Sequence, residues 1–264
     1  MNNFRLAVGD VVKSLARSQL FLMLGWQDVK QRYKRSKVGP FWLTISMGVM
    51  IATIGLVFGN IFSSPMAEFL PFLTLGLILW GFIFTSLTDG CNAFISSASI
   101  IKQLPVPLPI HVFRVIWRNS VILLHNLIIL PLVYLCFLKT PSPVALLSLI
   151  GFVLMVINVS WMALLFGVLS TRFRDVPQLV QSLFQVVFYL TPIIWMPHLL
   201  PARASTLLLS WNPFYHMLEV VRAPLLGDVP ALDSWVISIC MAVVGWLVSL
   251  AVYGVCRNKI AYWL

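Results

Sequence analysis

Charged and histidine side chains recur at helical spacing within one apolar stretch of the chain. Four of them lie three, four and seven positions apart, so a helix would carry all of them on one face: His111, Arg114, Arg118 and His125. A charge inside a membrane span is costly and normally faces an ionic partner or a wet cavity. Asp89, near the end of the preceding apolar stretch, lies at a depth comparable to Arg118, and we predict that these two residues pair. A structural tie between two helices is favoured over a transport role for this pair.

A second polar face, in a later apolar stretch, is rich in amides. It consists of Gln178, Gln181, Gln185 and Tyr189. Gln side chains both donate and accept hydrogen bonds, as a hydroxyl-rich ligand requires. We therefore predict that this face lines a sugar-conducting channel, together with Arg118 and His125 of the first set. Hydrogen bonding between helices is an equally good explanation of the pattern.

A basic run precedes the first apolar stretch, at the depth of lipid headgroups. It contains Arg32, Lys34, Arg35 and Lys37. Arg binds phosphate oxygens in a bidentate manner, so a lipid-linked phosphate or pyrophosphate is one candidate ligand. Ordinary anchoring to anionic lipid is the alternative.

Catalytic, metal and nucleotide motifs are absent from the sequence. It has no GxxxxGK[ST] phosphate loop, its 4 histidines show no HExxH spacing, and its 4 cysteines show no CxxC spacing. We therefore predict no catalytic residue, no metal site and no cofactor bound by this chain. The net charge of +10 lies beside apolar runs and not in a separate basic domain, which argues against a nucleic-acid partner.

Membrane-spanning helices must position these residues. The chain has 264 residues, is 60% hydrophobic and only 10% charged, and its apolar residues come in long runs. We predict an all-α membrane protein forming a single transmembrane domain over residues 1–264. It would comprise an amphipathic cytoplasmic interface helix over 1–37, a six-span bundle over 38–256 and a cytoplasmic tail over 257–264. The spans are expected at 40–62, 70–94, 110–137, 144–170, 178–197 and 234–256.

The connection between the fifth and sixth spans is unusual. Residues 198–233 are too apolar for a free loop and too broken by proline for another span. Irregular backbone at membrane depth is tolerated where protein or a wet cavity covers it. We therefore predict a re-entrant outer helical hairpin that borders a pathway.

Lys and Arg residues are distributed unequally between the two sides of the predicted bundle. Of the 18 Lys and Arg residues, all but three fall in the N-terminal segment, the second-to-third connection and its flank, the fourth-to-fifth loop or the tail. The exceptions are Lys139, Arg203 and Arg222. The positive-inside rule therefore predicts that both termini are cytoplasmic, and an even number of spans agrees with this.

A small-residue motif lies in the first span. Gly55 and Gly59 form a GxxxG pattern, which permits close approach of another helix. A dimer contact is one use of such a motif, although Gly is common in spans.

Several segments together resemble the permease subunit of ABC transporters that export polysaccharides across the bacterial inner membrane. Residues 28–42 (DVKQRYKRSKVGPFW) resemble the family's entry to the first span, and residues 173–177 (FRDVP) resemble its fourth-to-fifth loop. Residues 189–193 (YLTPI) resemble its fifth span, and residues 212–227 resemble its external gate. Their order and spacing around six spans carries the resemblance. Within the family the chain is most similar to the O-antigen and teichoic-acid type, through residues 112–119 (VFRVIWRN) and 124–126 (LHN).

The resemblance implies a homodimer of permeases with two copies of a separate ATPase subunit, which would bind ATP and Mg²⁺. It implies an ATPase-coupling set made of Asp28, Ser99, Ile100, Ile101, Lys102, Gln103 and Leu104. It also implies an outer gate made of Trp195, Pro197, Trp211, Asn212 and Pro213. The implied cargo is a lipid-linked polysaccharide, in the first place O-antigen on undecaprenyl pyrophosphate. The chain would then be a non-enzymatic, multi-pass permease of the inner membrane, in contact with membrane lipids.

Two alternatives stay open. The first is the same fold with another cargo, namely capsule, teichoic acid, a glycolipid or a drug. The second is a membrane-bound glycan ligase that uses outer residues, for which the sequence offers His198, Arg203, His216 and Arg222.

Overall fold

The computed structural model describes residues 2–34, 41–199, 201 and 208–264, and every regular element within these residues is helical. The α-helices are α1 (Asn2–Ala16), α2 (Ser18–Tyr33), α3 (Phe41–Ile61), α4 (Met66–Cys91), α5 (Ala98–Gln103), α6 (Pro109–Asn126), α7 (Ile129–Cys136), α8 (Leu147–Arg172), α9 (Val176–Leu190), α11 (Pro213–Leu226) and α12 (Leu232–Trp263). Two short 3₁₀ turns are η1 (Pro143–Leu146) and η2 (Pro197–Leu199). The prediction of an all-α fold is confirmed for these residues.

Five helical segments are long and apolar enough to cross a membrane: α3, α4, Pro109–Cys136, Pro143–Arg172 and α12. They correspond to five of the six predicted spans. The predicted fifth span contains α9, an apolar helix of 15 residues. At about 1.5 Å per residue, this helix reaches roughly 22 Å, which is short of a hydrocarbon core about 30 Å thick.

Two predicted helix ends differ from the structure. α9 ends at Leu190, not near residue 197, because the proline at 192 disfavours helical backbone at Thr191, which is extended (φ −93°, ψ 135°). α12 continues to Trp263, past the predicted limit at 256, so Arg257 lies within the same helix.

The N-terminal segment forms two helices and not one. The break falls at Arg17 (φ −93°, ψ 37°), and each half packs on a different partner. α1 lies against α12, where a Cβ atom at Gly254 would be only 2.8 Å from the Asn3 carbonyl oxygen. α2 lies against α6, where a Cβ atom at Gly25 would be 2.8 Å from Trp117 Cδ1.

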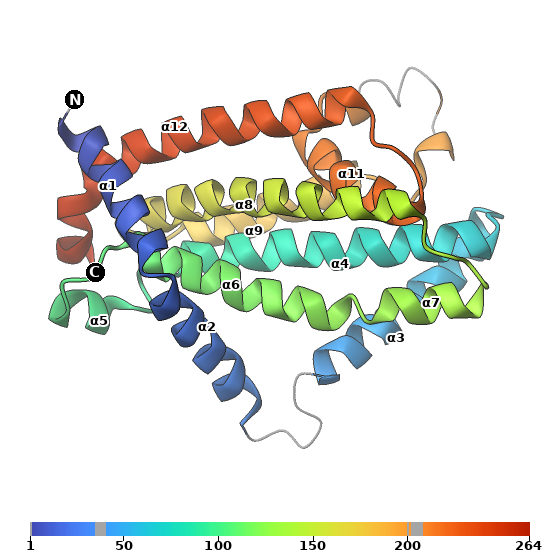
Figure 1. The fold of residues 1–264 in the computed structure, drawn as a ribbon, viewed down its shortest axis with the longest axis horizontal. Helices are drawn as coiled ribbons and strands as arrows, with labels where there is room; N and C mark the ends of the chain where they lie inside the picture. Colours follow the sequence, from blue (N-terminus) through green and yellow to red (C-terminus); the bar gives the residue numbers. More distant parts are fainter. Residues whose placement is uncertain (1, 35–40, 200, 202–207) are drawn as a thin grey trace.

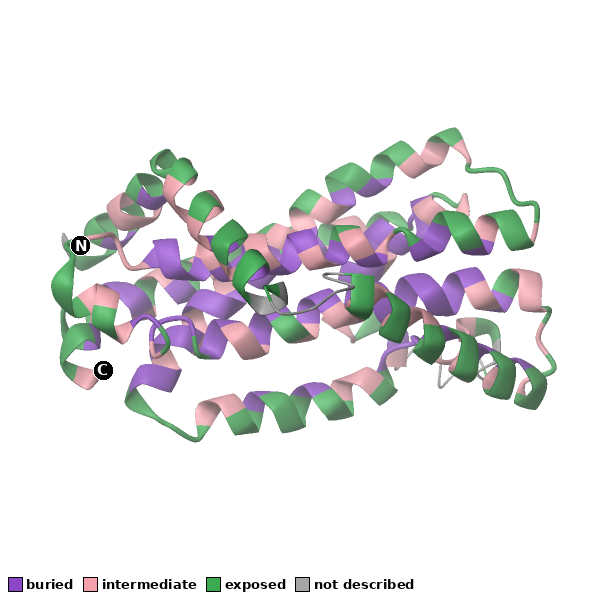
Figure 2. Ribbon diagram, turned by 90° about the horizontal axis from the view of Figure 1, so that it is seen from below, coloured by how far each residue is buried: buried purple, intermediate pink, exposed green. Residues whose placement is uncertain are grey.

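The core is centred on α4, which packs against α3, α6, α8, α9 and α11. The apolar window of α4 is 78% buried, whereas that of α3 is 11% buried, so α3 presents most of its apolar surface outward (Figure 2). Gly55 and Gly59 pack within the chain: a Cβ atom at either residue would clash with Leu70 or Met66 of α4. The close helix approach predicted from the GxxxG motif is therefore confirmed, and the approaching helix is α4 of the same chain.

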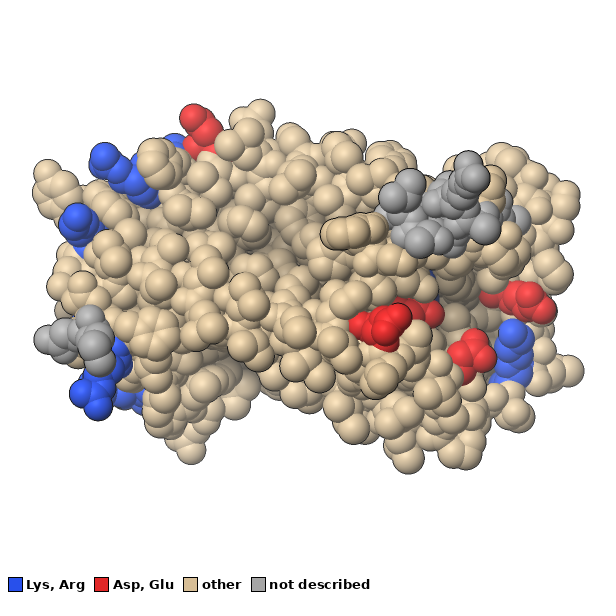
Figure 3. All heavy atoms as spheres, turned by 90° about the horizontal axis from the view of Figure 1, so that it is seen from above, with Lys and Arg blue, Asp and Glu red and all other residues tan. Residues whose placement is uncertain are grey.

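Both chain termini and α5 lie at one end of the bundle, and the α3–α4 and α11–α12 connections lie at the other (Figure 1). Lys and Arg side chains gather at the end with the termini, while on the face drawn in Figure 3 most of the visible Asp and Glu side chains lie at the opposite end. We call these the basic end and the opposite end.

Candidate functional site

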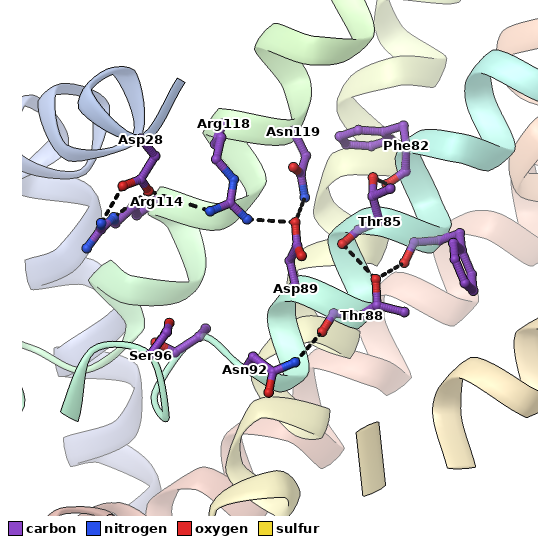
Figure 4. A network of polar contacts seen from close by, with 12 residues as sticks. Asp28, Phe82, Thr85, Thr88, Asp89, Asn92, Ser96, Arg114, Arg118 and Asn119 are labelled. Atoms are coloured by element: carbon purple, nitrogen blue, oxygen red, sulfur yellow. Dashed lines mark hydrogen bonds and ion pairs between the residues drawn. The ribbon is translucent and has the colours of Figure 1, made fainter. Parts of the chain in front are cut away.

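A chain of ion pairs joins α2, α6 and α4 towards the basic end (Figure 4). Arg114 donates to both carboxylate oxygens of Asp28, with Nε–Oδ2 at 2.7 Å and Nη2–Oδ1 at 2.5 Å. Arg118 Nη2 donates to Asp89 Oδ2 at 2.6 Å, and its Nη1 lies 3.6 Å from Asp28 Oδ2. Asn119 Nδ2 adds a hydrogen bond to Asp89 Oδ2 at 3.2 Å. We call these five residues the charge network.

Local sequence explains why the charge network assembles. Arg114 and Arg118 are four residues apart on α6 and therefore share a face. Gly25 lets the α2 backbone approach α6 closely, since a Cβ atom there would lie 2.9 Å from the Arg114 carbonyl oxygen. Asp28 is three residues further along α2 and so reaches both arginines. The four charged side chains are 14–32% exposed, so solvent screens the pairs only partly.

The predicted pairing of Asp89 with Arg118 is confirmed. The sequence did not indicate that Asp28 joins the same cluster, because Asp28 lies 86 positions from Arg114 and helical spacing relates only near neighbours. The family resemblance implies a coupling role for Asp28, whose carboxylate faces α6 of its own chain. We predict Arg118 in the channel wall, and its guanidinium lies between two carboxylates.

The other predicted coupling residues lie on and just after α5, at the basic end (Figure 1). Ser99, Lys102, Gln103 and Leu104 are exposed, whereas Ile100 and Ile101 are partly buried. Leu104 leaves the helix in an extended conformation (φ −122°, ψ 131°), as expected before Pro105. The result is a short helix with an exposed surface, connected to Asp89 by the turn that follows α4.

The predicted channel residues form two separate groups within one chain. Gln178, Gln181, Gln185 and Tyr189 are all exposed on α9, while Val180 and Phe184 face the core. His125 lies on α6, where its Nδ1 is 2.8 Å from the Val121 carbonyl oxygen and its ring packs edge-on to Phe41. α9 packs on α4 and α8, whereas α6 packs chiefly on α2 and α4.

The predicted gate residues meet where α9 ends and α11 begins. Asn212 caps α11 by accepting hydrogen bonds from the amides of Phe214 and Tyr215, and its Nδ2 donates to Thr191 Oγ1 at 2.9 Å. Pro213 occupies the first turn of α11, where its missing amide hydrogen has no cost. Trp195 and Trp211 flank this junction: Trp195 Nε1 donates to the Tyr189 carbonyl, and Trp211 is 81% exposed. Pro197 begins the 3₁₀ turn η2.

A shallow hollow of about 280 Å³ lies beside this junction, lined by the end of α9 and the start of α11, including Leu190, Trp211 and Phe214. Its walls are almost entirely apolar side chains. It is therefore a surface for packing and contains no cluster of catalytic groups.

The residues considered for a ligase are mostly engaged within the chain. His216 Nδ1 lies 3.0 Å from Ser234 Oγ, and its Nε2 lies 3.2 Å from the Ser210 carbonyl oxygen. Arg222 is 1% exposed and paired with Glu219. His198 is exposed, and Arg203 lies outside the described residues. Two of the three described residues thus have no ring nitrogen or guanidinium free for substrate chemistry.

The predicted headgroup site falls largely outside the described part of the chain. Arg35 and Lys37 are not described, and the Arg32 side chain is not described either. Lys34, directly after α2, is exposed. The network at Asp28 lies on the helix that leads into this segment.

A family model described as "ABC-2 type transporter" matches residues 19–226, a range that runs from α2 to α11 and contains the charge network. Two similar proteins from Klebsiella pneumoniae, each named "O-antigen export system permease protein RfbA", are 26% identical to this chain. The first alignment covers 75% of this chain and 77% of the relative, and the second covers 92% of each. A protein of the same name from Myxococcus xanthus is 20% identical, over 77% of this chain and 79% of the relative.

Proposed function

Because this chain belongs to the ABC-2 type transporter family, and is thus the membrane permease of an ABC exporter whose ATPase is a separate subunit, we propose that its cargo is a lipid-linked polysaccharide. O-antigen on undecaprenyl pyrophosphate is the specific cargo, carried across the bacterial inner membrane. The names of the three relatives support this cargo.

The outward-facing amides of α9 are the observation that carries the proposal. Gln178, Gln181 and Gln185 are exposed on an apolar helix. Polar groups that face hydrocarbon without a partner cost several kcal/mol each, so lipid is a poor environment for this face. A second copy of the permease and a hydroxyl-rich glycan would satisfy it. We therefore place these residues, with Tyr189, in the wall of a channel between two permeases.

The proposed topology has six spans and cytoplasmic termini. α9 and the segment that follows it, Thr191–Met196, together form the short fifth span. The location of both termini at the basic end supports this, because the positive-inside rule assigns the basic end to the cytoplasm (Figures 1 and 3). α1 and α2 form the cytoplasmic interface element, and η2 with α11 forms part of the re-entrant outer hairpin.

In the proposed cycle the chemistry of ATP belongs to two copies of the ATPase subunit, which bind ATP and Mg²⁺. The movement of these ATPase subunits is transmitted to α5 and Leu104 of the permease. The charge network joins the end of α4 to α6 and to the interface helix α2, so these three helices respond together. The basic run at Arg32, Lys34, Arg35 and Lys37 receives the pyrophosphate before the glycan enters. Alternation between channel states then moves the cargo.

Reconstitution with the ATPase tests the proposal. Proteoliposomes containing both subunits and lipid-linked O-antigen should expose the glycan on the far side only when ATP is hydrolysed. Parallel vesicles contain lipid-linked teichoic acid, a capsule precursor, a glycolipid or a drug instead. ATP-dependent export of one of these, without export of O-antigen, would identify a different cargo. Transfer or hydrolysis of the lipid-linked sugar by the permease alone would instead establish a glycan ligase and refute the proposal.

A further inference from the structure

One guanidinium at the opposite end holds two helices and a non-helical segment together. Arg222 of α11 is 1% exposed and is the largest of the fully buried side chains in the described residues. Its Nη1 donates to the Pro192 carbonyl oxygen at 2.6 Å, and its Nη2 and Nε donate to Glu219 Oε2 at 2.7 and 3.2 Å. The guanidinium carbon also lies 4.1 Å from the centroid of the Phe72 ring of α4. Arg222 therefore connects α11, α4 and the segment after α9.

Arg222 donates to non-helical backbone just after α9. Pro192 is buried and lies two residues past Leu190, the last residue of α9, so its carbonyl group is not part of the helix. A buried carbonyl group needs a hydrogen-bond partner, and the Arg222 guanidinium supplies it. Two uncharged contacts hold the same segment: Asn212 donates to Thr191 Oγ1, and the Ile193 backbone lies against Gly76, where a Cβ atom would be 3.2 Å from the Ile193 carbonyl oxygen.

The ion pair between Arg222 and Glu219 allows the hydrogen bond from Arg222 to the Pro192 carbonyl to break and re-form. Glu219 and Arg222 lie three residues apart on α11, so their ion pair moves with that helix as a unit. If the hydrogen bond to Pro192 breaks, Arg222 keeps its counter-ion, and no unpaired buried charge results. The loss is that of one charge-assisted hydrogen bond, which corresponds to a shift of roughly 10- to 100-fold in an equilibrium.

We propose that Arg222 is a positioning residue for the outer gate: it holds Thr191–Met196 against α4 in the closed state and releases this segment when the gate opens. The proposal rests on the assignment of this chain as an exporter permease with its gate at the opposite end. It assigns Arg222 a role in gating in place of the ligase chemistry considered from the sequence.

Accessibility of the gate segment tests this directly, in the complete permease–ATPase complex. The substitution Ile194→Cys is made after the four native cysteines are replaced, and its thiol is labelled from the outside with an impermeant reagent. Arg222→Met should raise the labelling rate at least tenfold without ATP, and Arg222→Lys, which keeps a cationic donor, should raise it less. Tyr253→Phe is the matched control, because it also removes one hydrogen bond to a charged group, that to Asp10, but at the basic end; its labelling rate should equal that of the parent.

Labelling of the Arg222→Met variant at the parent rate would overturn the proposal, and so would a lowered melting temperature without any change in labelling. If Arg222→Met does not assemble, the parent complex gives the answer: its labelling at residue 194 should rise when ATP and cargo are added, and continued protection during active turnover would refute a moving segment. The comparison between variants is made without ATP and requires no glycan. A wrong cargo assignment would leave the labelling differences between variants in place while export of O-antigen fails.

Discussion

Replacing Asp28 by Asn should destabilise the protein at the contact between α2 and α6. Asp28 makes two hydrogen bonds to Arg114 and lies 3.6 Å from Arg118, while Arg118 keeps a second carboxylate, Asp89. The substitution therefore leaves Arg114 as the unpaired charge. Removing one partner of a fully buried pair costs about 3–5 kcal/mol. Because the Arg114 side chain is 22% exposed, water compensates part of this, and we expect a loss of about 1–3 kcal/mol.

Reversible unfolding in mixed detergent micelles measures this free energy. Asp228→Asn is a suitable control, since Asp228 is exposed and belongs to none of the ion pairs among the described residues. Arg114→Gln and the double variant complete a cycle, and the double variant should cost clearly less than the sum of the two single changes. A cost below about 0.5 kcal/mol for Asp28→Asn, or an additive cycle, would refute the idea that this pair fixes α2 to α6.

Three further variants test the proposed transport path. Changing Ile100 and Leu104 to Asp should uncouple ATP hydrolysis from export while the permease still inserts, as measured by export per ATP; normal export would contradict the coupling role of α5. Gln181→Leu should lower glycan export several-fold without lowering the free energy of unfolding, whereas a parallel loss of stability would identify an interhelical hydrogen bond. Changing Arg32 and Arg35 to Gln should weaken binding of the lipid-linked pyrophosphate by about tenfold or more; a change in topology or expression alone would mean lipid anchoring.

The helical character and five of the spans could be predicted because both depend on local pattern. A run of about 20 apolar residues must satisfy its backbone internally, and this holds whatever its neighbours are. The pairing of Asp89 with Arg118 also follows from local information, because the ends of two consecutive spans fix their depths. The end of α9 also follows from a local signal, Pro192, although the predicted span extends to residue 197 and the helix ends at Leu190.

The choice of partners could not be predicted in the same way. Gly55 and Gly59 show that some helix approaches closely, but the pattern does not say whether it belongs to the same chain or to another. Helical spacing shows which residues share a face with Asp28, yet not that α2 folds back onto α6. Arg222 illustrates the same limit: its ion pair with Glu219 is a local pattern, whereas its contact with Pro192 depends on how α11 packs against the end of α9.

α4 runs between the basic end and the opposite end of the bundle, and at each end a charged side chain links it to other parts of the chain. Asp89 ties its last turns to α6 and, through Arg118, to α2. Phe72 and Gly76, in its first turns, support Arg222 and the Ile193 backbone. Because α4 is the most deeply buried of the candidate spans, it cannot bend easily without disturbing the packing around it. A displacement received at α5 should therefore reach the gate segment as a shift of α4 as a whole. Asp28→Asn loosens α2 but leaves the ion pair between Asp89 and Arg118 intact, so it should not change thiol labelling at residue 194. Asp89→Asn breaks that ion pair and should change the labelling. Equal labelling in both variants would refute transmission through α4.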